Sequence, residues 1–365
     1  MVDGLGASSR GLRSGFVDVA LRERNFLLLL GLMFFVAGAT YDVPKVAMWV
    51  GFAIAAYSAV ANDSVQTLGT FIASNQGRPW WHLWLWIGGV FLVTMTYSWI
   101  TYDGDVSYQR LAAKGFATAP TQFHFLHIAA PIFLLILTRL RMPVSTTFLL
   151  LSAFATTGSS IWKVTLKSIS GYGIAFVCAV VVWFVLGDWM KRTFRGAAHP
   201  AWRAGQWITT ALLWSVWLMQ DAANVAVYLP RQLSGWEFAA FSGTIFLGLG
   251  LLFRMGGERV QQVVDEKNDV TDVRAATVID FIYAVILYVF KFVSKMPMST
   301  TWVFVGLLAG RELAMAVRNS GKEERTFKHA AMLIGKDLLY VTIGFVVALV
   351  LAGIINPAVA EALLG

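Results

Sequence analysis

Charged residues are scarce in this sequence, and cysteine is almost absent. Only 14% of the 365 residues are charged, whereas soluble globular domains carry about 25%, so a soluble domain with an ordinary charged surface is excluded. The single cysteine, Cys178, lies inside an apolar run and has no partner for a disulfide within the chain. The sequence also lacks a P-loop, an HExxH motif and a GxSxG motif. It therefore gives no support for an enzyme or for an organic cofactor.

Hydrophobic residues make up 57% of the chain and gather in long runs. A helix that crosses a bilayer needs about 20 mostly apolar residues. Runs that approach this length occupy residues 46–61, 83–100, 123–137, 172–186, 208–219, 238–253, 278–292 and 339–355, with a shorter run at 26–38. We therefore predict an all-α integral membrane protein with about 10–12 transmembrane helices or half-helices.

The net charge of +8 comes from Lys and Arg gathered between the apolar runs. These residues concentrate in segments 191–203, 254–274 and 318–328. Basic loops of this kind mark the cytoplasmic side of a membrane protein, and no separate basic domain remains for nucleic acid. We expect no nucleic-acid partner, and we expect the protein in the cytoplasmic (inner) membrane of a prokaryote.

The two halves of the chain carry the same motif. Met-Pro-Val-Ser-Thr-Thr at 142–147 recurs as Met-Pro-Met-Ser-Thr-Thr at 296–301, an offset of 154 residues. Upstream, the Ala-Asn pair at 61–62 is echoed at 223–224. Paired halves with interrupted hydrophobic segments at matching positions are typical of repeat-built transporters. We divide the chain into a polar, amphipathic N-terminal segment (1–25), a first transmembrane repeat (26–190), a basic linker (191–203) and a second transmembrane repeat (204–365).

The recurring motif has the chemistry of an anion site. Proline stops or bends the preceding helix, and Ser or Thr can cap a new helix that begins directly after it. The first N–H groups of that helix and the positive end of its dipole then face the gap. The predicted anion-binding residues of the two motifs are Ser145, Thr146, Thr147, Ser299, Thr300 and Thr301. Because these donors are neutral, they can release an anion, whose charge a co-transported cation would balance.

Asn62 and Asp63 follow an apolar run and can supply oxygen ligands for such a cation. A carboxylate inside a membrane segment costs about 2.5–3.5 kcal/mol on insertion scales, so it seldom stands there without a partner. Several oxygen ligands around one carboxylate suit sodium, and they suit a proton carrier as well. The predicted cation-binding residues are Asp63, Asn62, Thr67 and Asp221, with sodium at Asp63; Asn62, Asn224 and Gln66 are assigned to the anion site.

Each motif alone has a plainer interpretation. A single Pro-x-Ser-Thr-Thr segment can be a helix kink, although its recurrence at half the chain length argues against this. Asn62 and Asp63 can lie in a loop at the membrane edge, and Asn224 can form a helix–helix hydrogen bond. Asp221 can be either a loop acid or a functional carboxylate.

At these residues the sequence resembles the inorganic phosphate transporter (PiT) family of phosphate and sulfate permeases. That family carries Gly-Ala-Asn-Asp and Pro-x-Ser-Thr/Ser-Thr signatures in each half. Here Ala61-Asn62-Asp63 is followed by Gly69 and Thr70 at the family's spacing, and both Pro-x-Ser-Thr-Thr copies match. In the second half Val225 replaces the family's acid, which leaves the number of coupled cations and the identity of the anion open.

The resemblance implies two inverted repeats, each with a re-entrant helical hairpin whose tip carries the Ser-Thr signature. It also implies phosphate bound between the two tips and the Asn-Asp helix breaks, coupling to sodium or protons, and a homodimer. We therefore predict a secondary active transporter of inorganic phosphate.

Hydrogen phosphate keeps a proton that it can donate to Asp63, which sulfate at neutral pH cannot do. A sulfate or other oxyanion permease of the same fold is the first alternative. An anion channel or a non-transporting membrane scaffold is the alternative from another class. A channel needs a continuous polar path, whereas this sequence shows local polar breaks.

Overall fold

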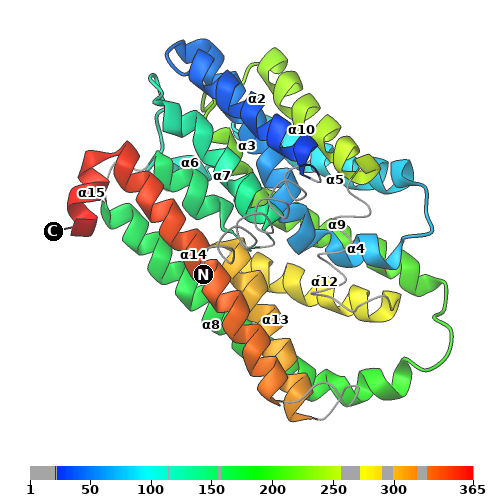
Figure 1. Cartoon of the computed structure of the whole chain (residues 1–365). Coiled ribbons are helices and arrows are strands. Elements are labelled where there is room, and N and C mark those ends of the chain that lie inside the picture. The colour runs from blue at the N-terminus through cyan, green and yellow to red at the C-terminus, as the bar shows by residue number, and fades with distance from the viewer. Residues whose placement is uncertain are drawn as a thin grey trace, which may run out of the picture.

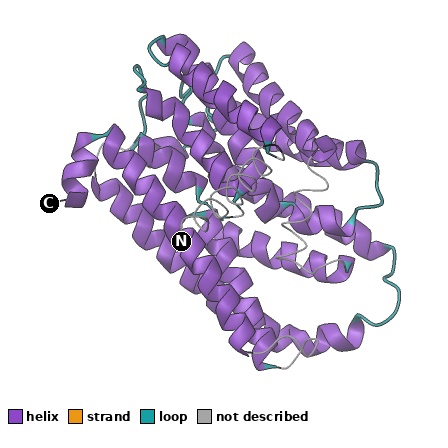
Figure 2. Cartoon of the chain, viewed as in Figure 1, coloured by secondary structure: helices purple, strands orange, loops and turns teal. Residues whose placement is uncertain are grey.

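The described part of the chain consists of helices joined by loops and turns, with no strand (Figure 2). The computed structural model describes residues 21, 23–113, 115–140, 142, 144–154, 158–255, 272–289, 299–318 and 327–364. Helices long and apolar enough to cross a membrane contain the spans Pro44–Asp63, Trp80–Thr101, Ser168–Met190, Gly235–Arg254, Thr300–Val317 and Phe327–Ile355. Shorter apolar helices occupy Arg24–Thr40 and Phe125–Arg139. The protein is an all-α integral membrane protein, as the apolar runs predict. Most of the predicted N-terminal segment lies outside the described residues.

The first part of the chain contains both long and short helices. In order they are α2 (Arg24–Thr40), α3 (Pro44–Thr67), α4 (Gly69–Ser74), α5 (Trp80–Thr101), α6 (Arg110–Ala113), α7 (Phe125–Arg139), the π-helical turn η1 (Thr147–Leu151) and α8 (Gly158–Thr193). Helix α3 packs on α7, and α5 packs on α10 (Figure 1).

The second part begins after residues 194–200, which join α8 to α9 within the predicted basic linker. Its helices are α9 (Ala201–Ala226), α10 (Gly235–Met255), α12 (Val273–Tyr288), α13 (Thr300–Val317), α14 (Phe327–Ile355) and α15 (Pro357–Leu364). Helices α8, α13 and α14 lie side by side, and α12 packs along α9 (Figure 1). Segments from both parts of the sequence are therefore interleaved.

Two glycines allow α13 to pack closely on α8. Gly306 and Gly310 are spaced as in the small-xxx-small pattern of membrane helix pairs. A Cβ atom on Gly306 would fall 2.5 Å from the carbonyl oxygen of Tyr172, and one on Gly310 would clash with the carbonyl oxygen of Phe176. The backbones of α8 and α13 thus touch where a larger residue would hold them apart.

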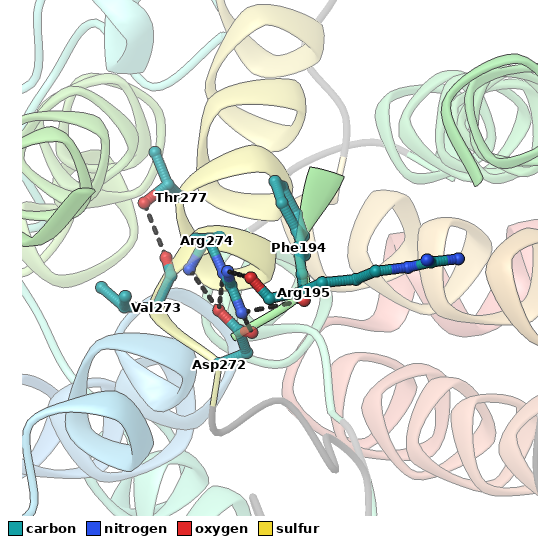
Figure 3. A network of polar contacts seen from close by, with 6 residues as sticks. All are labelled: Phe194, Arg195, Asp272, Val273, Arg274 and Thr277. Carbon is teal, nitrogen blue, oxygen red and sulfur yellow. Dashed lines mark hydrogen bonds and ion pairs between the residues drawn. The ribbon is translucent and has the colours of Figure 1, made fainter. Parts of the chain in front are cut away.

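A clamp of polar contacts fixes the start of α12 to the end of α8 (Figure 3). Asp272 caps α12 by accepting from the backbone N–H of Arg274 at 2.8 Å, and its carboxylate pairs with the guanidinium of the same residue at 2.6 Å. Nη2 of Arg274 also donates to the carbonyl oxygen of Phe194 at 3.0 Å. The clamp therefore spans the junction between the two parts of the chain.

Large apolar side chains lie on both the inner and the outer faces of the helices. Phe52 and Phe241 stack inside, with ring centroids 5.3 Å apart, and both are fully buried. Large apolar side chains also stand on the outside, where Phe35 and Val93 are each 72% exposed. Such outward apolar residues are expected of helices that face lipid. The interior also holds many polar side chains, and these form the candidate site.

Candidate functional site

Both copies of the Ser-Thr-Thr motif begin a helix with a serine cap. Ser299 is the N-cap of α13, and its hydroxyl accepts from the backbone N–H of Trp302 at 3.4 Å. The hydroxyl of Ser145 accepts in the same way from the N–H of Phe148, three residues later, at 3.2 Å. Serine is among the strongest capping residues because its side chain satisfies an N–H that has no partner within the helix. The two motif prolines, Pro143 and Pro297, lie outside the described residues.

The two helix beginnings meet in the interior. The hydroxyl of Ser299 donates to that of Ser145 at 2.7 Å, and both side chains are buried. Thr301 donates to the carbonyl oxygen of Val144 at 3.2 Å, which adds a second contact between the motifs. Residues that are far apart in the sequence therefore form one cluster of hydroxyl groups.

Asp221 links this cluster to the end of α9. Its carboxylate accepts from Thr300, from Thr147 at 3.3 Å and from the side-chain amide of Asn224 at 2.8 Å. The same amide donates to the hydroxyls of Thr146 at 3.1 Å and Thr147 at 3.2 Å. The Asp221 side chain thus contacts both motifs, which rules out the alternative of an exposed loop acid.

Asn62 and Asp63 lie near the end of α3, just before the break at Leu68 that separates α3 from α4. The amide of Asn62 donates to Asp63 at 2.7 Å and to the carbonyl oxygen of Val144 at 2.9 Å. Thr138 donates to the amide oxygen of Asn62 at 3.1 Å. Both residues of the pair are buried, so the alternative of a loop at the membrane edge is wrong.

Three buried oxygen atoms of predicted site residues have no hydrogen-bond donor among the described residues. They are Oδ2 of Asp63, Oε1 of Gln66 and Oδ1 of Asn224. Buried acceptors are usually satisfied, and an unpaired one often marks a bound ion or water. Carboxylate and amide oxygens are suitable ligands for a hard cation, so the donor set around Asp63 fits sodium. Within the described residues no group of three or more His, Cys, Asp or Glu is placed to hold a metal ion.

Most of the predicted residues lie in this one region, and two are engaged differently. Their hydrogen bonds form three neighbouring sets that share the two Ser-Thr-Thr motifs: Asn62 with Asp63 and, through Val144, with Thr301; Ser145 with Ser299; and Asp221 with Thr147, Thr300 and Asn224, which also binds Thr146. Thr67 donates to the backbone carbonyl of Asp63 within its own helix at 2.9 Å. Gln66 lines a neighbouring cavity instead.

That cavity contains an acid that the sequence interpretation missed. Asp280 on α12 is buried, and it accepts from Thr70 at 2.6 Å and from Thr210. Gln66, Thr70, Asp280 and Arg311 line the cavity together with apolar side chains. A lone acid inside the predicted apolar run 278–292 is itself a signal of function, since an unpaired carboxylate is costly in a membrane. Asp280 could therefore have been predicted as a candidate site residue from the sequence.

Arg110 was missed as well. It is the first residue of the short helix α6, and it is only 8% exposed. Helix α6 packs on α9, which carries Asp221. The sequence places Arg110 in a polar segment between two apolar runs, where an arginine is ordinarily solvated, so no local pattern marks it.

Comparisons with known proteins give one match. No family model matches the sequence, and no curated protein is similar to it. One solved structure, described as "The sodium-dependent phosphate transporter", has a similar fold, with a TM-score of 0.56 and 16% sequence identity. The alignment covers 91% of this chain and 99% of that structure. Membership of the PiT family stays a prediction, whereas the match over nearly the whole length shows that this chain shares the fold of that structure.

Proposed function

We propose that this protein is a secondary active transporter of inorganic phosphate, coupled to a cation. The proposal depends on one observation, the meeting of two serine-capped helix beginnings at the carboxylate of Asp221. Hydroxyls and helix N-termini are neutral donors that suit an oxyanion. The similarity to a structure described as a sodium-dependent phosphate transporter supports the same conclusion.

The hydroxyl groups of the two motifs can exchange their present partners for phosphate oxygens. Thr300 and Thr147 donate to Asp221, and Ser299 donates to Ser145. Each of these donors can rotate toward an anion, and a hydrogen bond to a charged group contributes about 1.5–3 kcal/mol. A protonated phosphate oxygen can in turn donate to Asp221, which favours hydrogen phosphate over sulfate.

A coupled cation is part of the proposal because the site contains carboxylates. Asp63 and Asp221 are both buried. An anion that enters beside them meets strong repulsion at low dielectric. Sodium bound at the unpaired oxygen of Asp63 would offset that repulsion, and a proton on a carboxylate would do the same. Sodium coupling, homodimer formation and a prokaryotic inner membrane remain parts of the proposal.

The test is uptake of labelled phosphate and labelled sulfate into proteoliposomes, with sodium and proton gradients imposed separately. We expect phosphate to accumulate against its gradient when a sodium gradient is present. Asp63→Asn should abolish the dependence on that gradient. Asp188→Asn is the matched control, because Asp188 is 58% exposed and pairs with Arg318 at 3.3 Å, away from the described site. Downhill flux alone would indicate a channel, and uptake of sulfate in place of phosphate would indicate a sulfate permease.

A further inference from the structure

Arg110 is a buried cation, and two of its donor atoms lack an acceptor among the described residues. These atoms, Nε and Nη2, are inaccessible to solvent. A guanidinium carries five N–H donors and stays charged in proteins. Burying such a group without partners costs free energy. A ligand that supplies acceptors to these N–H groups would recover part of that cost on binding.

The backbone just before Arg110 is held in an uncommon conformation. Tyr108 and Gln109 have φ angles of 54° and 60°, in the left-handed region that side chains rarely adopt. The carboxylate of Asp105 holds this turn by accepting from the N–H groups of Ser107 at 2.6 Å and Gln109 at 2.7 Å. Strain of this kind persists only where the surroundings enforce it, and it often marks a functional position. The turn fixes the direction in which α6 starts.

The same segment is fastened to the chain that follows α9. The N–H of Leu233 donates to the carbonyl oxygen of Gly104 at 2.9 Å, and the indole of Trp99 donates to the carbonyl oxygen of Leu233 at 2.7 Å. Helix α6 also packs on α9, which carries Asp221 and Asn224. Arg110 is thereby placed beside the end of α9 that contributes to the site.

We propose that Arg110 binds the transported oxyanion directly through its guanidinium, an inference that rests on the proposed function. Both oxygens of Asp221 already accept from Asn224, Thr147 and Thr300. A counter-ion for Asp221 alone would direct its N–H groups at that carboxylate, whereas Nε and Nη2 of Arg110 contact no acceptor in the part of the chain that the structure describes. These two atoms form the edge of the guanidinium that matches two oxygens of a phosphate. Arg110 therefore supplies the fixed positive charge that both Ser-Thr-Thr motifs lack.

The experiment measures binding of inorganic phosphate to the purified full-length protein by calorimetry, and the melting temperature with and without phosphate. Arg110→Gln should raise the Kd for phosphate about 10- to 150-fold, the range expected for loss of a charged hydrogen bond. The Kd of Arg110→Lys should lie between those of the parent protein and Arg110→Gln, because lysine keeps the charge and loses the paired N–H geometry. The melting temperature of Arg110→Gln without phosphate should equal or exceed that of the parent protein, because the variant removes an unpaired buried charge.

Arg231→Gln is the matched control. Arg231 donates to the backbone carbonyls of Phe116 at 2.7 Å and Leu229 at 2.7 Å, so its loss should lower the melting temperature and leave the Kd for phosphate unchanged. In the Asp221→Asn background, Arg110→Gln should still raise the Kd. If its effect disappears there, Arg110 acts only as a counter-ion and the inference is wrong.

Two failures can be told apart. A parent protein that binds phosphate, together with an Arg110→Gln variant that binds it equally well, overturns the role of Arg110 and leaves the proposed function intact. A parent protein that binds neither phosphate nor sulfate overturns the proposed function itself.

Discussion

Substitution of Thr300 by valine tests the contact between α13 and α9. Valine keeps the shape of threonine, so the change creates no cavity and removes one hydroxyl. That hydroxyl donates to the buried carboxylate of Asp221. A hydrogen bond to a charged group contributes about 1.5–3 kcal/mol. Thr300→Val should therefore lower the free energy of unfolding in detergent by about this amount, and it should raise the KM for phosphate uptake about 10-fold or more.

Thr244→Val provides the comparison. Thr244 lies on α10, and its hydroxyl donates to the carbonyl oxygen of Ala240 one turn earlier at 2.8 Å. Loss of such a local bond should change stability by less than about 0.5 kcal/mol and should leave the KM unchanged. If the two variants behave alike in both measurements, the carboxylate of Asp221 does not depend on Thr300, and the hydrogen-bonded cluster derived above is not the site.

Three further predictions concern contacts between segments. The double variant Ser145→Cys/Ser299→Cys, in a background without the natural cysteine, should form a disulfide under oxidation, because the two hydroxyl oxygens lie 2.7 Å apart; phosphate uptake should stop and should return on reduction. Gly310→Ala should destabilise the protein by about 1–3 kcal/mol through overpacking against α8, whereas Gly335→Ala, where nothing lies within 4 Å, should be neutral or stabilising. Asp272→Asn should reduce stability near neutral pH and have no effect in strong acid.

The pH dependence of the last variant follows from the pKa of the carboxyl group. Hydrogen bonds from Arg274 lower the pKa of Asp272 below its ordinary value. The stabilisation is therefore present above the unfolded-state pKa of about 3.9 and is lost as the pH falls through the folded-state pKa. Melting temperatures of the two proteins, measured from pH 7 downward, should converge. Parallel curves would contradict this account. A cysteine pair that stays reduced would contradict the contact between Ser145 and Ser299. A Gly310→Ala protein as stable as Gly335→Ala would contradict the close packing of α13 on α8.

The sequence predicted the meeting of the two motifs because capping chemistry is local and the motif recurs. Ser145 and Ser299 cap helix beginnings for reasons contained in a few neighbouring residues, and the repeat indicated that the two copies act together. Helix lengths were harder to predict. The apolar run 208–219 underestimates α9, which extends from Ala201 to Ala226. Its polar residues, such as Gln206, face the protein interior, so the apolar run in the sequence is shorter than the helix.

The burial of Arg110 could not be predicted from the sequence. Its burial results from the fold of residues 102–113 and from their hydrogen bonds to the segment after α9, neither of which leaves a pattern near residue 110. Asp280 is the opposite case. An acid within an apolar run is visible in the sequence, and the partners that satisfy it, Thr70 and Thr210, come from two other helices. Only the three-dimensional arrangement joins them.

The close packing of α13 on α8 has a mechanical consequence. Helix α8 contains 36 residues, which corresponds to about 54 Å of length, against about 30 Å for the hydrocarbon thickness of a bilayer. Gly306 and Gly310 leave no gap between the backbones of α13 and α8. We therefore expect a shift of α13 at its Ser299 cap to move α8 as well. If the proposed function is right, substitutions near the distant end of α8, where Arg274 donates to the carbonyl oxygen of Phe194, should then alter the rate of phosphate uptake.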